Sequence, residues 1–307
     1  MTALEEFDNF YTVELLPAMD KLKAECASAD NWGYMALFSF LLFVGFGIAG
    51  LTQNGLHATG MISIVAGILG IVSLYFYAKR NDAFNDDYKE LVVKKIIDHV
   101  VPGTSYKPDF CISQKEYKVS GLFRTCYDDY FGDDFMEGVY KNISFRCSGL
   151  ETKYENNSTI FKGFFFNARL SNWFSGGTYI WDRDFEQLPA SMMDEYRMMP
   201  MPHVVRIPIS GKNFNQYFSV CSTTPYEAVS LLSGERIKQI LELRQKLNTA
   251  MAISFVAGHC YVGIGTADDL LDSGAYKPDD KEQVMKSYVT ISLIPEIING
   301  LSLTELI

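Results

Sequence analysis

Charged side chains are missing from one long part of the sequence, because no Asp, Glu, Lys or Arg occurs between Asp30 and Lys79. Such a stretch does not fit a solvated surface, which soluble proteins cover with charged residues. Residues 33–52 and 60–78 are two apolar runs of about 20 residues each, long enough for a helix to cross the ~30 Å hydrocarbon core of a bilayer. A buried helical hairpin of a soluble core is the alternative, but such helices rarely exceed ~14 uninterrupted apolar residues. The sequence therefore predicts a transmembrane helical hairpin that turns in the polar linker 53–59.

Basic residues are outnumbered, with 27 Lys and Arg against 37 Asp and Glu and a formal net charge of −10. This balance argues against a nucleic-acid partner, which requires clustered Lys and Arg, and against a polybasic surface for anionic lipids. The six cysteines form no C-x-x-C pair, so zinc-site and thioredoxin-like spacings are absent. We expect these cysteines to be small buried side chains in a reducing compartment.

The familiar catalytic motifs are also missing, since neither G-x-S-x-G nor H-E-x-x-H occurs. Residues 45–50 match G-x-G-x-x-G, but no strand precedes them and they lie inside an apolar run. We expect these small residues to let the two helices approach each other, with Ala66, Gly67 and Gly70 opposite. His259 and Cys260 are adjacent, and neighbours on a strand point to opposite faces. We therefore assign no catalytic residue, no metal and no cofactor.

Positive charge flanks the predicted hairpin on both outer sides. Lys21 and Lys23 precede the first apolar run, Lys79 and Arg80 follow the second, and the linker carries no Lys or Arg. Because Lys and Arg near the ends of transmembrane helices favour the cytoplasmic side, both termini are expected there. The predicted organisation is an amphipathic helical segment over 1–32, the hairpin over 33–78, and a cytoplasmic α+β domain over 79–307.

Helices are also predicted on both sides of the hairpin. The three-to-four spacing of apolar residues over 3–26 predicts an amphipathic helix, which Pro17 should kink or divide. A further helix is expected over 84–101, where Pro102-Gly103 stops it. A later helix is expected from Pro225, capped by Thr224 with Glu227 in a capping-box pattern, and it should break near Ser233-Gly234 and resume to residue 248. A last helix is expected over 283–301, interrupted by Pro295.

Strand patterns dominate beyond Tyr106. Strands are expected over 139–147, 160–170, 176–181, 204–209 and 216–221, and residues 251–265 should form a hairpin turning at Ala257-Gly258. Residues 160–170 are apolar on both faces, which predicts a central strand. Residues 175–178 are interpreted as a hairpin turn around two glycines. These elements predict an α+β fold with a mainly antiparallel sheet and flanking helices.

One concentration of acidic residues is a candidate ligand or metal site. It is formed around Gly132 by Asp128, Asp129, Asp133 and Asp134. Closely spaced carboxylates can bind a hard cation, but the EF-hand spacing and its terminal Glu are absent. The alternative is a structural loop in which Gly132 takes a left-handed turn and the carboxylates accept backbone hydrogen bonds.

Several segments resemble one uncharacterised family. They are SGLF (120–123), YFGDDFMEG (130–138), FKGFFF (161–166), GGT (176–178) and YFSVCSTTPYEAVSLL (217–232). The chain resembles, over roughly residues 75–270, the bacterial membrane-protein family catalogued as domain of unknown function 3137. Members often carry Glu where this chain has Asp133. The resemblance implies a bacterial inner-membrane location and genes that lie near those of LemA-like membrane proteins, and it implies no catalytic residues.

The leading functional hypothesis is a membrane-anchored, non-enzymatic interaction or scaffold module. Its expected partners are the lipid bilayer and either other membrane proteins, LemA-like ones among them, or a second copy of the chain. The alternative is a membrane-bound, hydrolase-like enzyme that uses the acidic segment 128–134. A channel or transporter subunit is a third hypothesis, disfavoured by two short helices without charge inside the membrane.

Overall fold

The computed structural model describes residues 3–52, 56–155, 158–185, 204–209, 212–266, 271 and 281–306. The chain divides into two compact units, residues 1–95 with 272–285 and residues 96–271 with 286–307. Two long apolar helices are followed by an antiparallel sheet domain with flanking helices, which confirms the predicted fold class.

The first unit is helical. Its elements are α1 (Ala3–Phe10), the π-helix η1 (Tyr11–Leu15), α2 (Leu16–Thr52), α3 (Leu56–Tyr88), the π-helix η2 (Lys89–Val93) and the beginning of α4 (Lys94–Val100). The apolar stripe of the N-terminal segment is buried at Phe7, Tyr11 and Leu15. The π-helix ends two residues before Pro17, whose missing N–H cannot continue the hydrogen-bond ladder, so the predicted division falls there.

Small side chains let α2 and α3 pack closely. Ser63 donates a hydrogen bond from Oγ to the backbone oxygen of Phe43 at 2.9 Å. A Cβ added at Gly67 would lie 3.1 Å from the Phe43 ring, and one at Gly70 would lie 3.6 Å from Ser39. These contacts confirm the close approach expected for the small residues of α3. The exception among the expected positions is Gly45, where an added Cβ would meet nothing described within 4 Å.

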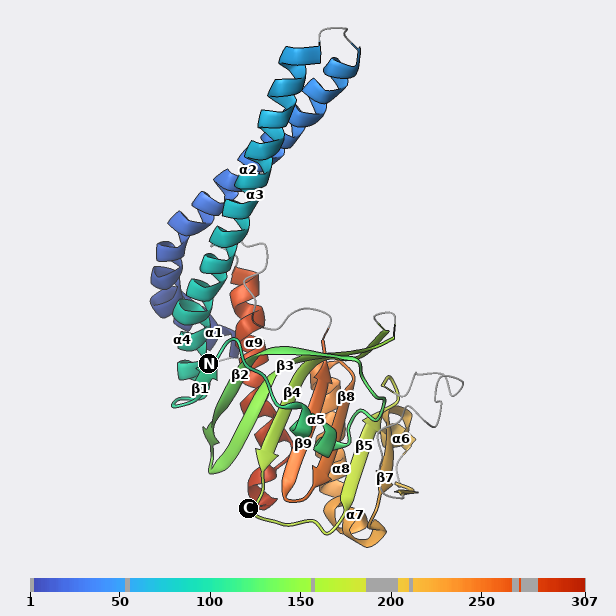
Figure 1. Ribbon diagram of the computed structural model, residues 1–307. Coiled ribbons are helices and arrows are strands. Elements are labelled where there is room, and N and C mark those ends of the chain that lie inside the picture. The colour runs from blue at the N-terminus through green and yellow to red at the C-terminus, as the bar shows by residue number, and fades with distance from the viewer. Residues whose placement is uncertain are drawn as a thin grey trace. The chain divides into compact units, whose positions relative to one another are not determined.

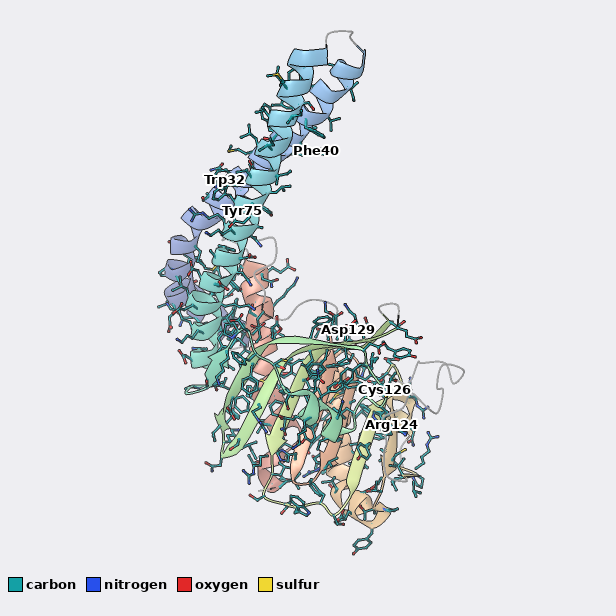
Figure 2. The ribbon with its side chains drawn as sticks, viewed as in Figure 1. Trp32, Phe40, Tyr75, Arg124, Cys126 and Asp129 are labelled. Atoms are coloured by element: carbon teal, nitrogen blue, oxygen red, sulfur yellow. The ribbon has the colours of Figure 1, made fainter. Side chains whose placement is uncertain are left out.

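The outer surface of these helices is apolar. Figure 2 labels Phe40 on α2 and Tyr75 on α3, which are 58% and 63% exposed. Two helical stretches, Asp30–Gly50 and Thr59–Val100, are long and apolar enough to cross a membrane. Of the predicted linker 53–59, residues 56–59 are helical, because α3 begins at Leu56, and residues 53–55 lie outside the described part of the chain.

The described strands of the second unit form one nine-stranded sheet in the order β1-β2-β3-β4-β9-β8-β5-β7-β6, and all of their pairings are antiparallel (Figure 1). The strands are β1 (Ser105–Lys107), β2 (Asp129–Tyr140), β3 (Ile143–Tyr154), β4 (Ser158–Arg169), β5 (Gly177–Asp182), β6 (Val205–Arg206), β7 (Phe218–Ser222), β8 (Met251–Val256) and β9 (His259–Gly265). The inner position of β4 confirms the central strand expected over 160–170.

Helices cover both faces of the sheet. They are α5 (Gln114–Ser120), α6 (Lys212–Tyr217), α7 (Pro225–Leu231), α8 (Gly234–Leu247), α9 (Lys281–Gly300) and the 3-10 helix η5 (Leu303–Leu306). Figure 1 shows α5 on one face of the sheet, with α8 and residues 286–300 of α9 on the other. On the α5 face, the Phe123 ring stacks on the Phe161 ring with their centroids 4.4 Å apart, and the ring centroids of Tyr117 and Phe165 are 5.5 Å apart. On the opposite face Phe166 stacks on Phe145 at 6.1 Å.

The strand predicted over 139–147 is two strands joined by a turn. Lys141 and Asn142 have φ values of 48° and 66°, so β2 ends before them and β3 begins after them. Asn tolerates this left-handed conformation well, and paired left-handed residues match the twist of a two-residue hairpin. The predicted alternation of Ile143, Phe145 and Cys147 is correct within β3, where all three are buried.

Other local predictions need correction on the β5 side. Residues 175–178 turn no hairpin, because β5 pairs with β7 and β8 and not with β4. Only Val205–Arg206 of 204–209 forms a strand, and Gln216 and Tyr217 belong to α6. Thr224 does not cap α7 through a backbone bond; its hydroxyl donates to the Glu227 carboxylate at 3.1 Å. The Ala257-Gly258 turn and the α8 boundaries at Ser233 and Asn248 are confirmed.

Replacing Phe166 by Ala should lower the free energy of unfolding by about 3–5 kcal/mol, because its ring is fully buried on the central strand β4. Phe131→Ala is the matched control: this ring is 54% exposed on β2, and its loss should cost less than about 1 kcal/mol. Urea unfolding of the full chain in detergent, followed by near-ultraviolet circular dichroism, measures both. Equal costs for the two variants would contradict the placement of β4.

Candidate functional site

Antiparallel register gathers polar side chains at one end of the α5 face. Two cross-strand rows run over β2, β3, β4 and β9 in that order, and they are Glu137–Arg146–Asn167–Tyr261 and Val139–Ser144–Arg169–His259. Because side chains alternate along a strand, all eight lie on the same face of the sheet. We call this group of residues, together with Glu116 of α5, the polar cluster.

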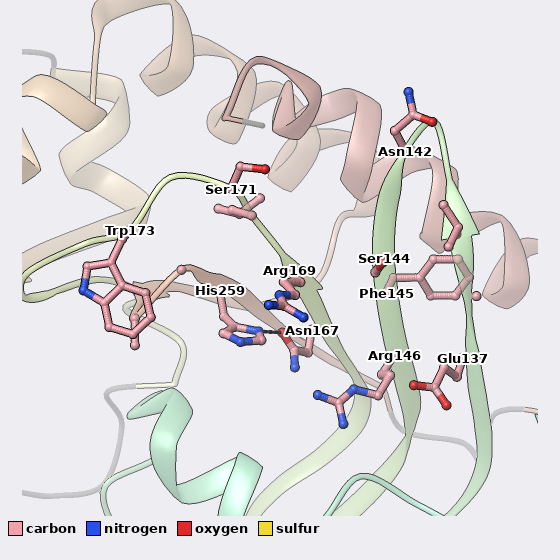
Figure 3. A pocket seen from close by; sticks show the side chains of 15 residues that line it. Glu137, Asn142, Ser144, Phe145, Arg146, Asn167, Arg169, Ser171, Trp173 and His259 are labelled. Carbon is pink, nitrogen blue, oxygen red and sulfur yellow. Dashed lines mark hydrogen bonds between the residues drawn. The ribbon is translucent and has the colours of Figure 1, made fainter.

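Hydrogen bonds join the polar cluster in a chain. Arg146 Nη1 lies 3.3 Å from Glu116 Oε2, and the Asn167 amide donates from Nδ2 to Glu116 Oε1. His259 Nδ1 lies 2.9 Å from Asn167 Oδ1 (Figure 3). Asn167 is 2% exposed, so its amide makes these bonds away from bulk water.

This series of hydrogen bonds fixes the tautomer of His259. A carboxylate only accepts hydrogen bonds, so the NH₂ group of the Asn167 amide must point toward Glu116. The amide oxygen of Asn167 therefore faces the imidazole. His259 must then donate from Nδ1. In the neutral ring the Nε2 atom therefore carries the lone pair.

The surroundings of His259 favour its neutral form. Burial lowers the pKa of the imidazole, Arg146 and Arg169 lower it further, and Glu116 opposes them. The ring also stacks on Tyr261, with centroids 5.6 Å apart and planes 21° from parallel. At neutral pH this geometry presents an uncharged imidazole beside two guanidinium groups.

The polar cluster, except for Glu116 and Tyr261, lines a hollow of about 1110 Å³. Figure 3 shows Trp173 on the side of the hollow away from Arg146, and its indole is 75% exposed. The neighbouring turn brings Gly258 to the same side, where an added Cβ would lie 3.4 Å from the indole. Arg169 is exposed and makes no ion pair with any carboxylate of the described residues. The hollow therefore combines two guanidinium groups, the Glu137 carboxylate, hydrogen-bonding groups and one aromatic surface.

Three of the four acidic residues predicted as a candidate site lie in a strand, and Asp128 lies in the bend just before it. Asp129, Asp133 and Asp134 lie in β2, which has a register shift between Asp133 and Met136. The left-handed residue is Asp134, with φ of 57°, and not Gly132. Gly132 instead permits close approach of β3, because an added Cβ would lie 2.5 Å from the Gly149 oxygen.

The four carboxylates occupy different surroundings. Asp134 is 1% exposed, and its Oδ1 accepts a hydrogen bond from the Tyr106 hydroxyl at 2.6 Å. Asp128 is exposed and accepts the backbone N–H of Glu155 at 3.1 Å. Asp129 is exposed and Asp133 is half-buried. Within the described ranges no three His, Cys, Asp or Glu side chains are grouped as a metal site. Binding of a ligand by these residues stays a prediction.

Sequence reasoning did not find the polar cluster. The sequence argues only against His259 and Cys260 as a pair, because neighbours on a strand point to opposite faces, and Cys260 is indeed buried in the sheet. The signal that could have found the cluster is the pair of polar residues Asn167 and Arg169, which follow the apolar residues Phe164–Phe166 within β4. Their partners come from strands whose pairing the sequence did not predict.

The comparisons with known proteins give one family match. Residues 159–303 match the family model described as "Protein of unknown function (DUF3137)". The predicted family resemblance is confirmed. The matched stretch begins and ends later than the expected 75–270, and it includes Asn167, Arg169 and His259 of the polar cluster.

The other comparisons do not indicate a biochemical activity for this chain. A search of curated proteins finds no match. Among solved structures, the crystal structure of the mycobacterial trehalose monomycolate transport factor A, TtfA, is similar with a TM-score of 0.36 and 7% sequence identity. That similarity covers 68% of this chain and 94% of the other chain.

Asp134→Ala should destabilise the sheet domain by about 2–4 kcal/mol, because it removes the bond from Tyr106 and places Ala in a left-handed conformation. Asp129→Ala, at an exposed position of the same strand, should change stability by less than about 0.5 kcal/mol. Urea unfolding measures the difference. Millimolar Ca²⁺ or Mg²⁺ should leave the Tm of the wild type unchanged; a rise that Asp133→Asn abolishes would instead support a cation site at 128–134.

Proposed function

We propose that this protein is a membrane-anchored, non-enzymatic interaction module of the bacterial inner membrane. The observation that carries the proposal is the apolar surface of α2 and α3, whose exposed side chains a lipid bilayer would cover. Basic residues flank both helices on their outer sides and are absent from the linker. Both termini and the sheet domain accordingly face the cytoplasm.

The binding surface of the module is the hollow lined by the polar cluster. Its rigid floor is the sheet, where Arg146, Asn167 and His259 lie on neighbouring strands. Such a concave surface, with a few placed polar groups beside an exposed aromatic ring, is typical of recognition sites. The partners are other membrane proteins, LemA-like ones among them, or a second copy of the chain.

A membrane-bound, hydrolase-like enzyme acting through the acidic segment is the competing function. Enzymes that use two carboxylates place both in one site. Here Asp134 is buried against Tyr106, whereas Asp128 and Asp129 are exposed. This separation favours the interaction module.

The orientation predicts a labelling pattern. Cysteine introduced by Asn54→Cys should react with a membrane-impermeant maleimide in whole cells, because the linker faces outward. Asn81→Cys, which lies in α3 just beyond the second apolar run, should react only after lysis. The wild-type chain is the control, since its native cysteines should be protected in whole cells. Labelling of Asn81→Cys but not Asn54→Cys in whole cells would reverse the orientation.

Interaction through the hollow predicts position-dependent cross-links. A photoreactive phenylalanine analogue replacing Trp173 should cross-link in intact membranes to a defined membrane protein or to a second copy of the chain. The same analogue replacing Tyr226, which is 89% exposed on α7, should not give this product. Mass spectrometry identifies the product. Identical patterns at both positions, or no cross-link at either, would contradict the proposal.

A further inference from the structure

Two arginines, Arg146 and Arg169, line the hollow together with the Glu137 carboxylate, in a chain of net charge −10. Arg169 lies between Ser144 and His259 in its cross-strand row. Arg146, in the adjacent row, contacts Glu116 through one guanidinium nitrogen at 3.3 Å. Guanidinium groups present a planar fork of N–H donors that matches carboxylate and phosphate oxygens in a bidentate manner.

We propose that the hollow binds a small molecule carrying an oxyanion group, a phosphate or a carboxylate, with Arg169 as its main contact and an adjoining ring or apolar part against Trp173. This deepens the proposed function, because it names the ligand chemistry of the same surface. The oxyanion lies at the Ser144–Arg169–His259 row, within reach of the Arg146 guanidinium.

The size of the hollow supports a ligand larger than a free anion. Small-molecule sites commonly enclose ~300–1,000 Å³, and this hollow, which is open on one side, has about 1110 Å³. The exposed Trp173 indole supplies an apolar surface that a bare phosphate would not use.

His259 adds a proton-dependent contribution. The groups that face it are Glu116 from α5, Arg146 from β3, Asn167 and Arg169 from β4, and Tyr261 from β9. In the free protein the imidazole is neutral and Nε2 can take a proton. A bound oxyanion favours the protonated ring, so binding takes up a proton and strengthens as pH falls.

Phenyl phosphate and benzoate are the probes, and phenol is the uncharged control. Titration calorimetry of the full chain in detergent should detect binding of phenyl phosphate, benzoate or both, and phenol should bind at least tenfold more weakly than the better anion. The stronger of the two anions identifies the oxyanion.

Arg169→Gln should weaken binding about 10- to 100-fold, as expected for loss of a charge-assisted bidentate contact. Arg206→Gln, the same change at an exposed residue of β6, should leave affinity unchanged.

Benzenesulfonate, which does not titrate between pH 5.5 and 8, tests the proton linkage. Its affinity should rise as pH falls in the wild type and lose this dependence in His259→Gln. Equal affinity of Arg169→Gln and wild type for the anions, or equal binding of phenol, would overturn the oxyanion site. If these titrations detect no binding while the cross-links at position 173 persist, the oxyanion site is wrong and the interaction module stands. If the cross-links are lost while the titrations detect binding, the interaction module is wrong and the oxyanion site stands.

Discussion

The register of β4 between β3 and β9 is the constraint on which the sheet domain depends. It places Phe164 and Phe166 toward α8 and α9, and Asn167 and Arg169 at the opposite face. A slip of one residue would exchange the two faces and bury the charge of Arg169. Gly163 secures the register, because its φ of 154° and its approach to Ile264 exclude any side chain: an added Cβ would lie 2.0 Å from the Ile264 oxygen.

Much of the fold could be predicted because it rests on local signals. The charge-free stretch predicts the helical hairpin, the residues apolar on both faces around Phe164–Phe166 predict β4, and Ala257-Gly258 predicts the β8–β9 turn. The acidic segment could not be predicted, because glycine serves two purposes that look alike in a sequence. At Gly132 it permits close strand approach, and the left-handed backbone falls on Asp134 instead. The partners of β5 are distant in sequence, so the misassigned turn at 175–178 had no local warning.

The candidate site eluded sequence reasoning for a related reason. Glu116, Arg146, Asn167 and His259 come from one helix and three strands, and no pair of them forms a motif. Register alone brings them into one hydrogen-bonded chain. The two units thus support complementary parts of the proposed function: apolar helices suited to a bilayer, and a sheet whose polar end is suited to recognition.

The protonation state of His259 is the most direct test of the polar cluster, because it depends on the strand register and on the hydrogen bonds that join Glu116, Asn167 and His259. Nitrogen-15 NMR of the full chain in detergent, with the imidazole signals assigned by comparison with His259→Gln, measures it. The hydrogen bonds from Glu116 through Asn167 to His259 predict the Nδ1–H tautomer, and the surroundings of the imidazole predict a pKa below the ordinary value of 6.5. An Nε2–H tautomer, or a pKa at or above 6.5, would contradict this arrangement of the polar cluster.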